Sequence, residues 1–153
     1  MTMRSPALAL LLAACITIPA RAHAQVEGGD ALTATMGFMD ALNSLDIDRL
    51  SGYFAPTVTA FVPLARAERV EGKEALVAIF RAFVERTRLT TARLNLVPED
   101  VEMVSNGPLA IVTFNVRDAA AGQVRRRTFV WQRKGGAWLM RHMHASDLAP
   151  PAG

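Results

Sequence analysis

The spacing of apolar residues changes near residue 89, from every third or fourth position to every second position. Before this point the pattern predicts amphipathic helices, and after it the pattern predicts strands separated by turns. Helices followed by a run of strands indicate an α+β fold with an antiparallel sheet, because a parallel sheet would need strands and helices to alternate. The alternating segments are 93–98, 101–104, 110–117, 123–133 and 137–146.

The first half of the domain contains three predicted helices. Asp30 is a suitable N-cap for a helix over 30–44, and Asp46 for a shorter helix that Pro56 ends. A short strand is expected over 58–62, and Gly72 opens the third helix. A long curved sheet wrapped around such helices encloses a cavity, which is a natural site for a small molecule.

The N-terminal residues have the pattern of a secretory signal peptide. Arg4 precedes an apolar run over 7–14, and Ala22-His23-Ala24 is a small-x-small cleavage site. The run is shorter than the roughly 20 residues that a membrane-spanning helix needs. We therefore expect a periplasmic or secreted protein, with the alternative of an envelope lipoprotein anchored at Cys15, whose context resembles a lipobox. The expected organisation is signal peptide 1–24, polar lead-in 25–29, one domain over 30–148 and a flexible tail 149–153.

Charge argues against a nucleic-acid partner once the signal peptide is removed. Losing Arg4 and Arg21 from 17 basic residues leaves 15 against 14 acidic ones, a net charge of +1. The run Arg125-Arg126-Arg127 is local, and strand alternation divides it between two faces of the sheet. We interpret it as a solvated edge or rim in preference to the alternative of an anion site.

Both histidines of the mature chain lie in the last predicted strand. Strict alternation places five of its residues on one face, so this strand is expected to form the wall of a semi-polar pocket. Those residues are Trp138, Met140, His142, His144 and Ser146.

Three segments follow one another in an order that is typical of one family. They are Phe38-Met39-Asp40-Ala41-Leu42-Asn43 with the exit Tyr53-Phe54-Ala55-Pro56, the glycine-led Val70-Glu71-Gly72-Lys73, and the closing strand from Gly136-Ala137-Trp138 to His144-Ala145-Ser146. Over 30–148 the chain resembles the SnoaL-like families of the nuclear-transport-factor-2-like superfamily. The resemblance implies a cone-shaped α+β fold and a homodimer formed through the outer sheet face. It implies no single function, because the superfamily includes cyclases, isomerases, dehydratases and kinase association hubs.

A catalytic hypothesis uses His144 or His142 as a base. The resemblance places the first helix across the concave face of the sheet, so Asp40 would orient the imidazole and Tyr53 would donate to an oxyanion. A metal site is not expected, because the mature chain has no further histidine or cysteine to act as a third ligand.

The leading hypothesis is a domain that binds a small, largely apolar ligand in the cone cavity without catalysis and without a cofactor. It requires an enclosed cavity beside His142 and His144. The alternatives are a cofactor-free lyase, isomerase or cyclase acting on a small carbonyl-bearing or polycyclic substrate, and a structural dimerisation hub with a collapsed cavity. The expected ligand-binding residues are Tyr53, Met140, His142, His144, Ser146 and Asn115.

Overall fold

The computed structural model describes residues 30–65 and 69–147. The predicted signal peptide, the candidate anchor Cys15, the lead-in 25–29 and the tail 149–153 lie outside the described residues. None of the helices in the described part is long and apolar enough to cross a membrane.

The three predicted helices are confirmed, although the second ends at Gly52 and Pro56 lies within the strand that follows. They are α1 (Ala31–Asn43), α2 (Ile47–Gly52) and α3 (Lys73–Arg88). The Asp30 side chain accepts a hydrogen bond from the Thr33 amide at 2.8 Å, and Asp46 accepts one from the Arg49 amide at 3.0 Å. Both caps satisfy backbone donors of a first helical turn, which is why the helices begin where the sequence predicts.

The strands form one curved six-stranded sheet in the order β2-β1-β6-β5-β4-β3. Strands β1 and β6 are parallel to each other, while the other neighbours are antiparallel. The two segments expected at 93–98 and 101–104 form one strand with an irregularity near Asp100, which has a φ of 50°. The strands are β1 (Phe54–Phe61), β2 (Val70–Glu71), β3 (Leu96–Asn106), β4 (Leu109–Asp118), β5 (Gln123–Lys134) and β6 (Ala137–Asp147).

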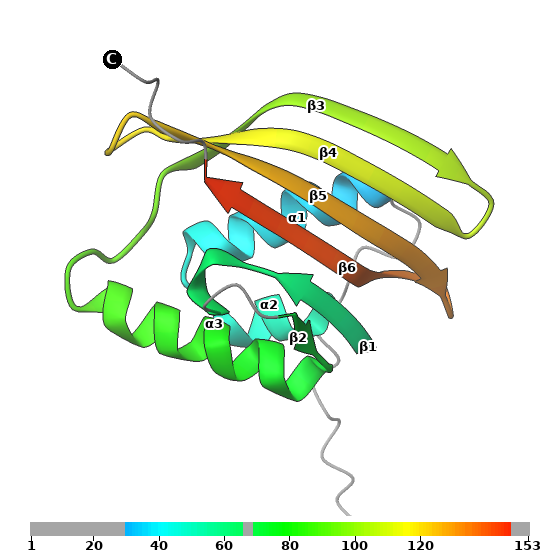
Figure 1. The fold of residues 1–153 in the computed structure, drawn as a ribbon, viewed down its shortest axis with the longest axis horizontal. Coiled ribbons are helices and arrows are strands. Elements are labelled where there is room, and N and C mark those ends of the chain that lie inside the picture. Colours follow the sequence, from blue (N-terminus) through cyan, green and yellow to red (C-terminus); the bar gives the residue numbers. More distant parts are fainter. Residues whose placement is uncertain (1–29, 66–68, 148–153) are drawn as a thin grey trace, which may run out of the picture.

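Helix α1 lies across one face of this sheet, with α3 on the same side next to β1 (Figure 1). Phe38 of α1 is fully buried, and its ring meets the rings of Phe80 and Phe129 with centroids 6.2 and 5.2 Å apart. The indole N–H of Trp131 donates to the Thr35 hydroxyl at 2.9 Å, so the one buried polar side chain of the described core has a partner. This helix-facing side is called the inner face of the sheet below, and the opposite side the outer face.

Strand β6 contains one residue more than β5 at the point where they pair. Met140 pairs with Trp131 but His142 pairs with Val130, so Arg141 is an extra residue, a β-bulge. Side chains alternate along a strand, and one inserted residue therefore reverses the faces of everything that follows it. Met140 and Met143 are both buried although they are three positions apart, which strict alternation forbids.

The expectation that His142, His144 and Ser146 share a face with Met140 is therefore wrong. His142 pairs with Val130, which points away from the core because its neighbours Phe129 and Trp131 are fully buried on the inner face. The bulge sends His142, His144 and Ser146 to the outer face.

Candidate functional site

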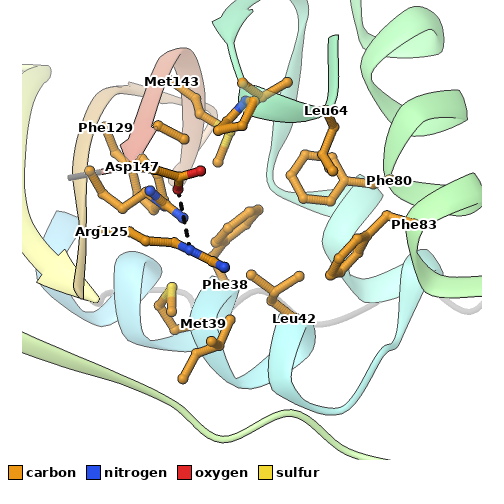
Figure 2. A pocket seen from close by; sticks show the side chains of 15 residues that line it. Phe38, Met39, Leu42, Leu64, Phe80, Phe83, Arg125, Phe129, Met143 and Asp147 are labelled. Atoms are coloured by element: carbon orange, nitrogen blue, oxygen red, sulfur yellow. Dashed lines mark ion pairs between the residues drawn. The ribbon is translucent and has the colours of Figure 1, made fainter. Parts of the chain in front are cut away.

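A cavity of about 240 Å³ lies between α1, α3 and the inner face of β5 and β6. Figure 2 shows that most of its wall is apolar and comes from several elements far apart in the sequence. The apolar lining consists of Phe38, Met39 and Leu42 from α1, Phe80 and Phe83 from α3, Val62, Pro63 and Leu64 after β1, Leu96 from β3, and Phe129, Met143 and Ala145 from β5 and β6.

The remaining lining residues are all charged: Arg125 and Arg127 of β5 and Asp147 of β6. Arg125 and Asp147 form an ion pair with Nε and Oδ1 3.2 Å apart (Figure 2). The same Nε is buried and makes no hydrogen bond among the described residues, so the pair is held by Coulomb attraction with imperfect hydrogen-bond geometry.

Arg127 is more deeply placed than Arg125. Its Nη1 donates to the carbonyl oxygen of Arg126 at 2.7 Å and lies 3.5 Å from that of Ser146. Burial, and to a smaller extent the positive charge of Arg125, lower the pKa of Arg127 to about 10, with Asp147 opposing the shift. The guanidinium is still charged at neutral pH. None of the ion pairs within the described ranges includes it.

The interpretation of the arginine run as a solvated rim is wrong for two of its three members. Arg126 is exposed on the outer face, but Arg125 and Arg127 have the parity of Phe129 and Trp131, which are fully buried. That shared parity was the sequence signal for a basic inner wall. It was overlooked because charge runs are usually solvated.

The two histidines lie outside this cavity. The Nδ1 of His142 is hydrogen-bonded to the Thr59 hydroxyl at 2.8 Å, and both imidazoles pack edge-on against Phe61. Burial lowers the pKa of His142, and the charges of His144 and Arg69 lower it further. The binding hypothesis required an enclosed cavity beside His142 and His144, and the cavity described above does not meet this requirement: it is partly open, neither histidine lines it, and it lies on the other face of their strand.

Asp40 is not brought to either histidine. Its carboxylate is half exposed on α1 and pairs with Arg49 at 3.0 Å and Arg93 at 3.2 Å. Hydrogen bonds from Arg49 and Arg93 hold the pKa of this carboxyl below its usual value. The imidazole–carboxylate pair on which the catalytic hypothesis depends is absent from the described geometry.

The other expected ligand-binding residues also lie elsewhere. The ring of Tyr53 packs against Phe38 and Trp131, with centroids 6.0 and 6.2 Å away. Met140 is fully buried in the core. Asn115 is on the outer face and donates to Asp100 at 2.8 Å. None of the six expected residues lines the cavity described above.

No group of three or more potential metal ligands occurs in residues 30–65 and 69–147. The arrangement instead combines an apolar chamber with two cations and one anion on a single wall. Such a site can hold an apolar body and orient a polar group.

The chain belongs to the SnoaL-like domain family, whose model matches residues 32–151. No curated protein matches it.

Solved structures with the same fold have diverse descriptions. A putative dehydratase of the NTF2-like family from Streptomyces avermitilis is 18% identical, with a TM-score of 0.66, covering 78% of this chain and 95% of that one. An NTF2-like protein of unknown function from Pseudomonas putida is 21% identical, with a TM-score of 0.68 and coverage of 79% and 86%. A putative calcium/calmodulin-dependent protein kinase type II association domain from Thiobacillus denitrificans is 21% identical, with a TM-score of 0.65 and coverage of 77% and 94%. At these identities the likeness shows the nuclear-transport-factor-2-like fold alone.

The lowered pKa of His142 makes stability sensitive to acid. Between the lowered pKa and the ordinary histidine value of 6.5, the folded protein binds fewer protons than the unfolded chain. The contribution of neutral His142 to the free energy of unfolding is therefore lost as pH falls through that window. We predict that His142→Gln, which keeps a polar partner for Thr59, loses less melting temperature than the parent between about pH 7.5 and about pH 5. His144→Gln is the comparison variant and reduces the parent's slope by less, because burial, the largest cause of the lowered His142 pKa, is unchanged in it. Equal losses of melting temperature in the parent and in His142→Gln would contradict the assignment of this acid sensitivity to His142.

Proposed function

We propose that this protein is an exported SnoaL-like domain that binds a small, largely apolar molecule in the cavity between its helices and the inner sheet face, without catalysing a reaction. The observation that carries the proposal is the cavity itself. Its volume of about 240 Å³ equals about eight water molecules at roughly 30 Å³ each. The cavity is partly open to solvent, so a ligand can enter it. A collapsed core, as the structural-hub alternative requires, would not leave this space.

The lining supports binding more than acid–base chemistry. Twelve of its fifteen described residues are apolar, and none of the fifteen carries an imidazole, thiol, phenol or hydroxyl group. The one carboxylate, Asp147, is paired with Arg125. The histidine-based lyase, isomerase or cyclase hypothesis therefore has no support from the geometry of this cavity.

The size of the cavity limits the ligand. Pockets for drug-sized molecules are usually about 300–1,000 Å³, and this one is smaller. The aromatic rings of Phe38, Phe80 and Phe129 favour a flat or short-chain body that fits between them. A one-ring or two-ring molecule fits this description.

Export is part of the proposal and rests on the N-terminal sequence. The apolar run over 7–14 and the cleavage pattern at Ala22-His23-Ala24 support it, and cleavage after Ala24 would leave a chain without cysteine. The alternative, a lipid on Cys15, would keep the same domain at the envelope surface.

Exposed apolar side chains on the outer face support a homodimer formed by two such faces. Val104 is 74% exposed and Ile111 is 47% exposed, and the register places Val104, Ile111 and Val130 in one row across three strands. A contiguous apolar row on a sheet surface is more stable when covered. A second copy would cover it with the same residues.

To test ligand binding, we predict that Ala145→Phe abolishes binding of a neutral aromatic probe such as indole, measured by isothermal titration calorimetry. The new ring would project from β6 into the cavity that Ala145 lines. His144→Phe is the matched control. It introduces the same ring one position away, on the outer face of the sheet, and it retains binding. Loss of binding in His144→Phe alone would mean that the ligand binds beside the histidines on the outer face. A parent protein that binds neither this neutral probe nor an aromatic acid of similar size would contradict the proposal.

To test the dimer, we predict that Ile111→Lys converts a dimer to a monomer in light scattering coupled to size-exclusion chromatography. A buried lysine without a partner is costly at such an interface. Leu89→Lys is the control, because Leu89 is 85% exposed at the end of α3, away from the sheet, and this variant remains dimeric. A monomeric parent would contradict the proposed assembly.

A further inference from the structure

The charges on the cavity wall are not balanced. Asp147 is the one carboxylate among the described lining residues, and it faces the two guanidinium groups of Arg125 and Arg127. Its ion pair is with Arg125, whereas Arg127 has neutral carbonyl oxygens as its recorded hydrogen-bond partners. One positive charge in a largely apolar chamber is therefore left without a counter-ion in the described geometry. Such a charge is costly to bury unless an anion joins it.

The two arginines are suitably spaced to hold one planar anion. Alternate residues of a strand lie about 7 Å apart on one face, and each guanidinium presents a fork of donors. Arg127 uses Nη1 for the two backbone carbonyls. Its lowered pKa is a further sign that it sits in a poorly solvated place without enough negative charge.

The occupant is a monoanion by charge balance. Adding one negative charge to Arg125, Arg127 and Asp147 neutralises the wall, whereas a phosphate dianion would overcompensate it. A carboxylate is planar and matches the guanidinium fork. The rest of the molecule must be apolar, because the side chains across the cavity from Arg125 and Asp147 are apolar and include Leu64, Phe80 and Phe83 (Figure 2).

Asp147 lies where it can compete with such a ligand. Its side chain is 58% exposed against 31% for Arg125, so its carboxylate has water close by when it leaves the pair. The Arg125 Nε makes no hydrogen bond in the present pair, and a better-placed carboxylate oxygen would provide one.

Given the proposed binding function, on which this inference rests, we propose that the physiological ligand is an apolar monocarboxylate, an aromatic or short-chain aliphatic acid. Its carboxylate lies between Arg125 and Arg127 and displaces Asp147 from Arg125, while its apolar body fills the space between the phenylalanine rings. Asp147 is then an internal counter-ion that occupies Arg125 until the ligand arrives.

The test compares an acid with its neutral isostere, phenylacetate against phenylacetamide, by isothermal titration calorimetry on the full-length protein. We expect phenylacetate to bind about tenfold or more tightly than the amide, because charge-assisted hydrogen bonds are roughly twice as strong as neutral ones. Arg127→Gln and Arg125→Gln each remove this preference, measured as the ratio of the phenylacetate affinity to the phenylacetamide affinity of the same variant. Asp147→Asn strengthens phenylacetate binding severalfold, since it frees Arg125.

Arg126→Gln is the matched control. It removes the same charge one position away on the outer face, and phenylacetate affinity is unchanged. If Arg126→Gln and Arg127→Gln weaken phenylacetate equally, the effect is long-range charge and the inference is overturned. A melting curve establishes that each variant folds, and Asp147→Asn tests the competition even where an arginine variant does not fold.

The outcomes separate this inference from the proposed function. Equal binding of acid and amide by the parent protein overturns the carboxylate proposal and leaves a neutral apolar ligand in place. Absence of binding for both, together with absence of indole binding, overturns the binding function itself.

Discussion

The extra residue in β6 is the constraint on which the inner and outer faces of this protein depend. Arg141 has no partner in the register between β5 and β6, so every side chain after it changes face. Met143, Ala145 and Asp147 consequently face the helices and meet the inner side of β5, where Arg125 pairs with Asp147. With strict alternation the same wall would carry two imidazoles, and the arginines would have no carboxylate beside them.

Local signals in the sequence were enough to predict most of the fold. Helix caps at Asp30 and Asp46 act within one turn, and alternation over β4 and β5 acts within one strand, so both can be recognised without tertiary context. The parallel pairing of β1 with β6 and the bulge were missed, because each depends on how two distant segments align. A trace of the bulge was present in the sequence: Met140 and Met143 are apolar residues three positions apart in a strand.

The sequence was enough to predict that a cavity exists, but not which residues line it. A cavity between the curved sheet and the helices followed from the fold class, but its lining was assigned to the wrong face of β6. The parity of Arg125 and Arg127 with Phe129 was available, yet the usual solvation of charge runs outweighed it. The fold is shared by proteins with different described roles, and the chemical preference proposed for this chain therefore rests on these charged residues in the cavity rather than on the fold.

The face on which each residue of β6 lies is most directly measured by nuclear Overhauser effects in the isotope-labelled protein. The account predicts contacts between the Met143 methyl group and the ring of Phe129, with the His142 imidazole in contact with Thr59 and Phe61. Contacts of the His144 imidazole with the Phe129 ring, and none from Met143, would mean that β6 alternates without a bulge. That result would contradict the arginine-lined cavity and everything inferred from it.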